Sequence, residues 1–340
     1  MSTSNSAPSG SHRAAMWLSR LAPLLGLIGV YALFAIIGPS SFISVRNLET
    51  IARQTAIVGI ASLGMTLVIV AGGIDLSVGS IVALATVATA GLLQLMMPDG
   101  ATTAAAAALL PLLAGCGGML AAAFCGWVNG FLITRLRVVP FIVTLGTLLV
   151  LRGAAKGVAH EQKIDAPLTW LNELLAALGP GHHWMLAPPG VWIMVVLAVA
   201  VAVVLRYTRF GRHVVAIGSN ELTARLCGVP VERVKLLVYV LSGAFAGIAG
   251  LMQFSRLTVG DPTVAVGLEL DVIAAVVIGG GSLSGGEGSV LGSLVGALIM
   301  TVIRSGCSQM GLPNWVQEIV TGGIIVLAVA LDRLRSRRTR

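Results

Sequence analysis

Apolar runs long enough to cross a lipid bilayer recur along almost the whole chain. A transmembrane helix needs about 20 predominantly apolar residues. Only 11% of the 340 residues are charged, whereas ordinary soluble domains carry about 25%. We therefore expect an all-α polytopic membrane protein and not a soluble enzyme.

The apolar runs predict about ten transmembrane helices. Their ranges are 21–38, 55–72, 78–97, 103–133, 138–155, 190–206, 234–254, 270–280, 288–306 and 315–331. The fourth run is longer than a bilayer requires, so it must tilt, bend or extend beyond the membrane. The eighth run is short and leads directly into glycines.

The two ends of the chain differ from the apolar part and divide the sequence into three regions. Residues 1–20 are polar and rich in serine and glycine, which predicts a disordered tail. Residues 21–332 are predicted to form a single transmembrane domain, followed by a basic tail at residues 333–340. The run 21–38 resembles a signal-peptide core but exceeds the usual length of about 7 to 15 residues, and we interpret it as an uncleaved first span.

The basic residues indicate how the spans are oriented. Ten spans place both termini on one side, and 15 of the 22 lysines and arginines fall on that side. Cytoplasmic loops carry an excess of basic residues, so both termini are predicted to be cytoplasmic. The net charge of +8 fits this topology, and without an aromatic platform beside it we expect no nucleic acid partner.

Two predicted loops are long: residues 156–189 outside the membrane and residues 207–233 in the cytoplasm. The external loop contains LTWLNELLAAL, whose leucines follow helical spacing. This pattern predicts a helix on the outer membrane surface, acting as a lid or as a docking element. His182 and His183 in the same loop lack a nearby cysteine or carboxylate cluster, and the four cysteines show no CxxC spacing. Neither a metal site nor a disulfide scaffold is expected.

Residues 279–289, GGGSLSGGEGS, contain LSGG, the core of the signature with which ABC ATPases bind ATP. An ATPase also needs a phosphate-binding loop, GxxxxGK[ST], and none of the three lysines of the chain follows a glycine. Apolar spans flank LSGG on both sides. We therefore interpret the stretch as a tight turn between spans eight and nine, where glycine permits the required backbone conformations, and the chain as not an ATPase.

The cytoplasmic loop contains the signals of a short helix. Asn220 can cap a helix from Glu221 to about Cys227, and Gly228 can end it before a proline. A short helix projecting from a membrane domain can transmit the movement of a cytoplasmic motor. A solvated loop without that role is the alternative interpretation.

Three separate segments resemble one known family. They are AIGSNELTARLCGV with the following VERVKLLVYVLSGAFAGIAG, AGGIDLSVGS at residues 71–80, and VGDPTVAVGLELDVIAAVVIGGGSLSGGEGS at residues 259–289. All three resemble the ABC importer permeases of the ribose and related monosaccharide class, which is also related to branched-chain amino acid permeases. The resemblance spans roughly residues 45–332. Thr223 and Gly281 depart from the family's usual alanine and threonine, which leaves the sugar specificity open.

The resemblance implies a fold like that of type II ABC importers and a permease subunit in the cell inner membrane, surrounded by lipid. The implied partners are a cytoplasmic ABC ATPase, an external solute-binding protein and a second permease copy in a homodimer or heterodimer. ATP and magnesium would be held by the ATPase, so no cofactor is expected in this chain. The residues expected to couple the chain to the ATPase are Gly218, Asn220, Glu221, Ala224, Arg225 and Gly228.

Several polar residues within or beside the spans are candidates for the translocation path or for helix caps. Asp75, with Ser77 after it, can cap span three or serve transport directly, because a charge in the bilayer must find a polar environment. Asn129 can hydrogen-bond another helix or a sugar hydroxyl. Glu269, with Asp271, can cap span eight, and Glu269 can alternatively contact the binding protein.

Small residues at GxxxG-like spacing predict close helix packing, either within one subunit or at the dimer interface. They are Gly243, Gly247, Gly250, Gly292 and Gly296.

Other functional classes remain open from the sequence. An ion-coupled secondary transporter would need intramembrane acids or broken helices in symmetric repeats, and no half matching Asp75 is evident. A receptor-like scaffold would show no substrate flux. An ABC permease for amino acids or nucleosides is the closest alternative.

Overall fold

Helices account for nearly all regular structure in the computed structural model, which describes residues 10–97, 103–179 and 185–338. Within these ranges the α-helices are α1 (Gly10–Ile37), α2 (Val45–Val70), α3 (Val78–Met96), α4 (Ala104–Leu136), α5 (Pro140–Val158), α6 (Pro189–Tyr207), α7 (Arg209–Ser219), α8 (Glu221–Leu226), α9 (Val231–Leu257), α10 (Leu268–Ile278), α11 (Val290–Gln309) and α12 (Asn314–Arg338). The remaining elements are the 3-10 helices η1 (Ser40–Ile43) and η2 (Trp170–Leu175) and the strands β1 (Ile164–Asp165) and β2 (Val259–Gly260). A helix coincides with every predicted span.

Seven helices among the described residues are long and apolar enough to cross a membrane: α2, α3, α4, α5, α6, α9 and α11. Shorter apolar stretches lie within α1, at Pro23–Ile37, and within α12, at Asn314–Ala330. α10 has 11 residues, about 16 Å at 1.5 Å per residue, so it reaches only about halfway through a hydrocarbon core of ~30 Å. The predicted all-α, multi-pass fold is confirmed.

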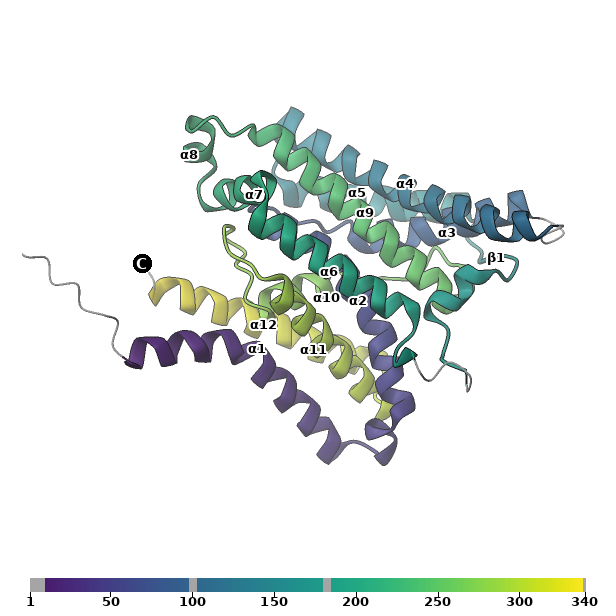
Figure 1. Ribbon diagram of the computed structural model, residues 1–340, viewed down its shortest axis with the longest axis horizontal. Coiled ribbons are helices and arrows are strands. Elements are labelled where there is room, and N and C mark those ends of the chain that lie inside the picture. The colour runs from purple at the N-terminus through teal and green to yellow at the C-terminus, as the bar shows by residue number, and fades with distance from the viewer. Residues whose placement is uncertain (1–9, 98–102, 180–184, 339–340) are drawn as a thin grey trace, which may run out of the picture.

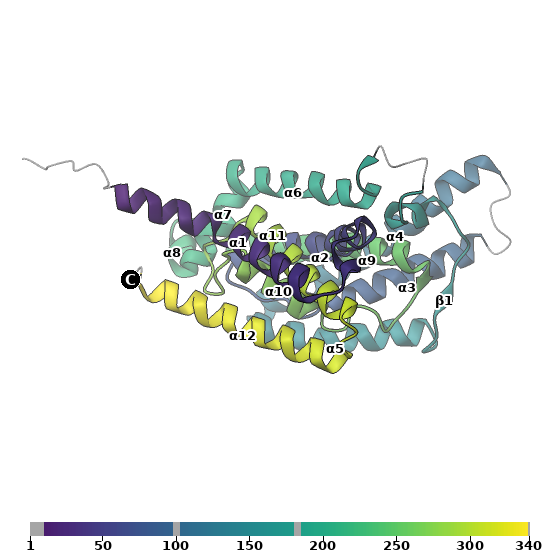
Figure 2. The ribbon, with the colours of Figure 1, turned by 90° about the horizontal axis from the view of Figure 1, so that it is seen from below.

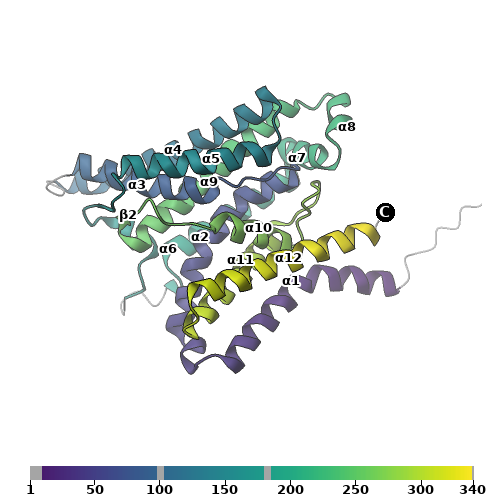
Figure 3. The same ribbon diagram turned by 180° about the vertical axis from the view of Figure 1, so that it is seen from behind.

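α2 lies at the centre of the bundle, and 89% of its most apolar window is buried inside the protein. α9 packs along α4 and against α2 and α3, whereas α1, α11 and α12 lie on the other side of α2 (Figures 1 and 3). Figure 2 shows α6 on one face of the molecule and α5 with α12 on the opposite face. α5 and α6 bury only 11% and 22% of their windows, so most of their apolar surface faces outward.

The overlong fourth run is one continuous helix, α4. Its N-cap Thr103 accepts a hydrogen bond from the amide of Ala106 at 3.2 Å, and the helix continues for 33 residues with Pro111 inside it. At 1.5 Å per residue it is about 50 Å long. Because the hydrocarbon core is about 30 Å thick, α4 must tilt or project from the membrane, as the sequence predicts.

Both ends of the chain are more helical than the sequence analysis predicts. α1 begins at Gly10, inside the segment predicted as a disordered tail, and α12 continues to Arg338, through most of the predicted basic tail. Alanine, methionine, leucine and arginine follow Gly10, and arginine and leucine dominate the end of α12. These residues have high helix propensity, so each span continues as helix beyond its apolar part.

The external loop does not form the predicted surface helix. β1 pairs with β2 in antiparallel fashion, with Ile164 opposite Gly260, and the leucine-rich segment forms the 3-10 helix η2 instead of an α-helix. Leu171 and Leu175 are buried, and the Leu175 amide donates to the hydroxyl of Ser255 on α9 at 2.8 Å. The leucines therefore face the protein core rather than lipid. His182 and His183 lie outside the described residues.

The glycine-rich stretch is a turn between α10 and α11, as predicted. Gly280, Gly285 and Gly286 have φ angles of +93°, +84° and +79°, a backbone region that favours glycine. The Gly286 amide donates to the carbonyl of Val70 at the end of α2 at 2.9 Å. Through this hydrogen bond, Gly286 of the LSGG sequence connects the α10–α11 turn to the end of α2.

Candidate functional site

α8 is the short helix that the sequence predicts after Asn220. The Asn220 side-chain oxygen accepts a hydrogen bond from the Thr223 amide at 2.9 Å, which satisfies one of the free amides of the first turn. Gly228, with φ +81°, follows the helix in the left-handed conformation typical of a helix end. Figure 1 shows α8 at one extremity of the molecule, beyond the ends of α6 and α9.

Ion pairs fix α8 against the start of α9. The Lys235 ammonium lies 2.6 Å from the Glu221 carboxylate, and the Arg225 guanidinium lies 3.3 Å from the same carboxylate. Arg225 also pairs with Glu232. Burial, the largest single influence on Glu221, raises its pKa, but hydrogen bonds and charges from Lys235 and Arg225 outweigh burial and leave the pKa below its ordinary value. Glu221 and Arg225 therefore orient α8.

The outward edge of α8 is apolar. Leu222 and Leu226, one helical turn apart, are 68% and 81% exposed, whereas Ala224 between them is buried. Residues at i and i+4 lie on the same face of a helix, so the two leucines form one projecting edge, which we call the leucine edge. The sequence analysis missed it, although the spacing of two leucines on opposite sides of an alanine is the signal that could have found it.

Gly218, at the end of α7, connects the α7–α8 segment with the helix bundle. A Cβ atom on Gly218 would meet the Val70 carbonyl and would stand 2.5 Å from the Gly286 amide nitrogen. The end of α7 therefore lies in backbone contact with the end of α2 and with the α10–α11 turn. Gly218 is thus a predicted coupling residue whose backbone is in direct contact with the helix bundle.

Asp75 is fully buried in the break between α2 and α3. Its carboxylate accepts hydrogen bonds from the Ser77 amide at 3.0 Å and the Ser77 hydroxyl at 2.6 Å, and from the Ser242 hydroxyl at 3.0 Å. The Asn129 amide group donates to the Ser77 hydroxyl at 2.8 Å. Ser77 itself occupies the N-cap position of α3, so Asp75 stabilises the turn before the cap rather than capping α3, and the four residues join α3, α4 and α9.

Glu269 and Asp271 stand in the first turn of α10, but neither caps it. The N-cap position belongs to Gly267. The Glu269 carboxylate lies against Gly79 in the first turn of α3, where the partial positive charge of a helix N-terminus is favourable for an anion. The Arg304 guanidinium of α11 lies 2.6 Å from the Asp271 carboxylate, whose side chain is 1% exposed.

The small-residue positions all make close contacts within the chain. Gly243 lies against Gly126 of α4, Gly250 against Val82 of α3, and Gly292 against Gly279. The two remaining positions behave alike: Gly247 meets Met119 and Ala122, and Gly296 meets Ala275. Of the two predicted uses of these glycines, the structure supports packing within one subunit.

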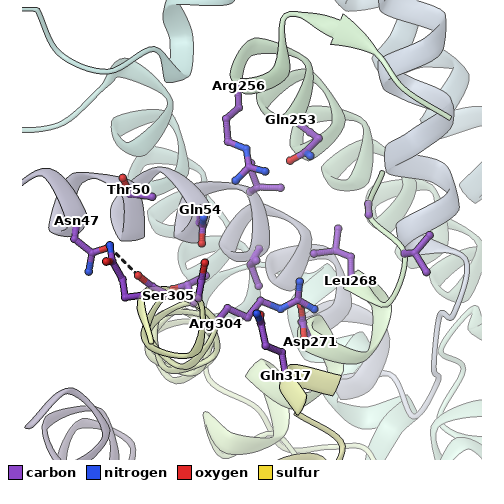
Figure 4. A pocket seen from close by; sticks show the side chains of 17 residues that line it. Asn47, Thr50, Gln54, Gln253, Arg256, Leu268, Asp271, Arg304, Ser305 and Gln317 are labelled. Carbon is purple, nitrogen blue, oxygen red and sulfur yellow. Dashed lines mark hydrogen bonds and ion pairs between the residues drawn. The ribbon is translucent and has the colours of Figure 1, made fainter. Parts of the chain in front are cut away.

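A polar cavity of about 380 Å³ opens among α2, α9, α10, α11 and α12. Asn47, Thr50 and Gln54 line it from α2, Gln253 and Arg256 from α9, and Asp271, Arg304, Ser305 and Gln317 from the other three helices. In Figure 4, Arg256 and Gln253 point into the space from one side, and Arg304, Asp271 and Gln317 lie on the other. The sequence analysis missed most of these residues because they come from five separate helices.

Among the described residues, no three or more histidine, cysteine, aspartate or glutamate side chains gather as metal ligands would.

The bundle, the half-helix α10 and the projecting α8 define a permease. The model of one protein family, described as the permease component of the branched-chain amino acid transport system, matches residues 47–329, and the chain belongs to this family. It is a multi-pass protein of the cell inner membrane. Like other permease subunits of ABC importers, it is not itself an ATPase and carries no cofactor.

The relatives that match most of this chain include permeases of ribose and of L-arabinose. The ribose import permease protein RbsC of Escherichia coli K12 is 38% identical over 93% of this chain and 94% of its own length. RbsC of Bacillus subtilis is 38% identical over 94% of each chain. The L-arabinose ABC transporter permease protein AraH of Azospirillum brasilense is 35% identical over 96% of this chain and 92% of its own. No solved structure matches the chain.

Family membership sets aside two interpretations that the sequence left open. An ion-coupled secondary transporter and a scaffold without flux both differ in kind from an ABC importer permease.

Proposed function

We propose that the chain is the permease subunit of an ATP-driven importer of a monosaccharide, working by alternating access. The observation that carries this proposal is the leucine edge of α8, which is exposed, apolar and braced by ion pairs. Exposed apolar side chains rimmed by charges are typical of a protein docking surface. The ribose and L-arabinose permeases among the relatives support a sugar as substrate.

The proposed topology has ten membrane segments, with α1, the half-helix α10 and α12 added to the seven long spans. Both termini and α8 then lie in the cytoplasm, since fifteen of the 22 basic residues flank that side. The loop between α5 and α6 and the β1–β2 pair face outward, where a solute-binding protein would deliver the sugar. A second copy of the chain or a related permease completes the assembly.

In the proposed mechanism, ATP closes the two ATPase subunits and moves α8. Gly218 transmits this movement to the end of α2 and to the α10–α11 turn, because its backbone is in contact with both. ATP can shift the population between inward-facing and outward-facing states only through differential contacts with the two. The α8–ATPase contact is the proposed source of that difference.

Co-purification tests the proposal. The chain is expressed with its cellular ATPase, and the double variant Leu222→Ser, Leu226→Ser is compared with the wild type. We expect the wild type to retain the ATPase and the double variant to lose most of it. Leu186→Ser is the matched control, because Leu186 is 84% exposed and lies beyond the opposite ends of the helices. Equal ATPase recovery with all three chains would refute the docking role of the leucine edge.

A second candidate function is the import of an amino acid, which the description of the matching family favours. Uptake of radiolabelled D-ribose, L-arabinose and L-leucine into liposomes that contain the full complex distinguishes the two functions. ATP-dependent uptake of a sugar supports the first, and uptake of leucine alone supports the second.

A further inference from the structure

The cavity between α2 and α9 to α12 is lined by charged side chains, among them Asp271. The Asp271 side chain is 1% exposed, and although its Oδ2 pairs with Arg304, its buried Oδ1 has no hydrogen-bond partner among the described residues. A buried polar atom without a partner costs about 1–3 kcal/mol, so Asp271 makes this wall of the cavity strongly polar, although its second oxygen lies below the cavity surface.

Arg256 supplies a positively charged hydrogen-bond donor to the cavity. Its guanidinium lines the cavity and points into it (Figure 4), and no ion pair or hydrogen bond joins it to another residue in the described part of the chain. Arg53, whose positive charge acts on Arg256, already donates to the Leu175 carbonyl at 2.5 Å. The N–H donors of Arg256 can therefore bind a ligand oxygen.

The remaining wall combines amides and hydroxyls with apolar side chains such as Ile57 and Leu268. Gln54 and Gln253 line the cavity without a side-chain hydrogen bond to another described residue, and each amide can both donate and accept hydrogen bonds. The amides of Asn47 and Gln309 are already bonded to each other. The volume of about 380 Å³ falls within the range of about 300–1,000 Å³ typical of small-molecule sites. A branched aliphatic side chain placed here would leave the amides of Gln54 and Gln253 desolvated and unpaired, at a cost for each.

We infer that this cavity is a substrate subsite within the permease, which takes an uncharged polyhydroxylated solute of monosaccharide size. Hydroxyl or ring oxygens of the solute accept from Arg256, and the amides of Gln54 and Gln253 pair with its other hydroxyls. The inference rests on the proposed function and adds to it that the permease itself recognises the sugar, inside one subunit.

The Arg304–Asp271 pair forms one wall of the site. The Arg304 guanidinium lies 2.6 Å from Asp271 Oδ2, so the buried carboxylate is paired within the wall and the half-exposed Arg304 faces the cavity. A monosaccharide can replace the water of this cavity hydroxyl by hydroxyl, which makes binding weak and release easy. Weak binding suits a subsite through which a solute must pass.

Saturation-transfer NMR on the permease–ATPase complex in lipid nanodiscs, without the binding protein, tests the inference. The probes are D-ribose, L-arabinose, D-xylose, D-galactose and L-leucine, each alone at millimolar concentration. The same complex, with binding protein added, is assayed in liposomes for ATP-driven uptake of each probe. We expect the imported sugar to give a saturation-transfer signal and L-leucine to give none.

The diagnostic variant is Arg256→Gln, which breaks no hydrogen bond or ion pair between described residues. The loss of a charged hydrogen bond predicts a rise of about tenfold in the half-saturating sugar concentration, and Gln253→Ala should raise it as well. Gln94→Ala is the matched control, because Gln94 is an exposed glutamine of α3 away from the cavity. Thermal unfolding of each complex verifies that the variants are folded.

Three results would overturn the inference while the proposed function stands. These are an unchanged sugar signal in both cavity variants, no signal from the imported sugar, and competition by L-leucine for the same signal. If the liposomes import no sugar at all, the proposed function fails and the inference falls with it.

Discussion

Gly218 near the end of α7 lies so close to Gly286 in the α10–α11 turn that no side chain fits between them. A Cβ atom on Gly218 would stand 2.5 Å from the Gly286 amide nitrogen, and that amide is already bonded to the Val70 carbonyl at 2.9 Å. Three segments distant in the sequence thus meet through backbone atoms. Contact of this kind transmits displacement, because no flexible side chain lies between the segments.

Replacement of Gly218 tests this connection. We predict that Gly218→Ala reduces ATP-driven uptake severalfold while the ATPase stays bound, since the leucine edge of α8 is unchanged. The added methyl group must displace the backbone of Val70 or Gly286, and such overpacking costs about 1–3 kcal/mol. The measurement is uptake together with ATPase co-purification from the same membranes.

Gly146→Ala is the matched control for that prediction. Gly146 lies in α5, and a Cβ atom there would meet nothing within 4 Å, while alanine favours a helix over glycine. Uptake should be unchanged. Normal uptake by Gly218→Ala would mean that the contact is not part of the transmission.

The second prediction concerns the buried carboxylate of Asp75. Asp75→Ala should destabilise the purified chain by about 1–3 kcal/mol, because buried hydroxyls of Ser77 and Ser242 lose their acceptor. Asp75→Asn should cost less, since one oxygen remains to accept. Thermal unfolding in detergent measures both, with the exposed Asp165→Ala as control.

Asp75→Asn also separates the two roles that the sequence leaves open. A structural role predicts that loss of uptake follows loss of stability across the Asp75 variants. A direct transport role predicts a stable Asp75→Asn protein that imports nothing.

Two features of the sequence show how far local patterns predict this protein. The cap at Asn220 and the end of α8 at Gly228 depend on neighbouring residues only, and both are as predicted. The segment around Leu171 has the helical spacing of an amphipathic helix, but its conformation depends on bonds to Ser255, about 80 residues away. Non-local contacts of that kind leave no pattern in the sequence.

In the candidate site, too, local patterns were predictable from the sequence and non-local contacts were not. GxxxG spacing correctly indicates that the backbone of α9 approaches other helices closely, but not which helices. The cavity was not predictable, because its lining comes from polar residues scattered over five helices, each unremarkable on its own helix. Asp271 was singled out as a cap because only its place in the sequence was known.

The third prediction concerns the effect of acid on the β1–β2 pair. The Asp261 carboxylate accepts from the Thr263 amide at 2.8 Å and hydroxyl at 2.6 Å and lies 3.4 Å from the Lys163 ammonium. Burial, the largest single influence, raises its pKa, but the Thr263 hydrogen bonds and Lys163 outweigh burial and hold the pKa below the ordinary 3.8. A lowered folded-state pKa means that its stabilisation is fully present well above pH 3.8 and is lost as the pH falls through the folded-state pKa.

Hydrogen exchange of residues 159–175 measures this effect. Exchange corrected for intrinsic rates should be constant from pH 7 to about pH 5 and should rise on further acidification. Asp261→Asn should raise the exchange rate already at pH 7. Asp165→Asn should not, because the Asp165 side chain in β1 makes no hydrogen bond or ion pair with another described residue. Equal protection in the two variants would show that Asp261 does not hold the loop.

The last prediction is an asymmetry within the Arg304–Asp271 pair. The Asp271 side chain is 1% exposed, but the Arg304 side chain is 44% exposed. Arg304→Gln therefore leaves a buried charge without its partner and should destabilise the chain by about 3–5 kcal/mol. Asp271→Asn leaves an arginine that water can reach, so it should cost clearly less, and adding Asp271→Asn to Arg304→Gln should restore much of the lost stability. Thermal unfolding of the three variants measures these losses. Equal losses for the two single variants would mean that the carboxylate is not held as a charged group.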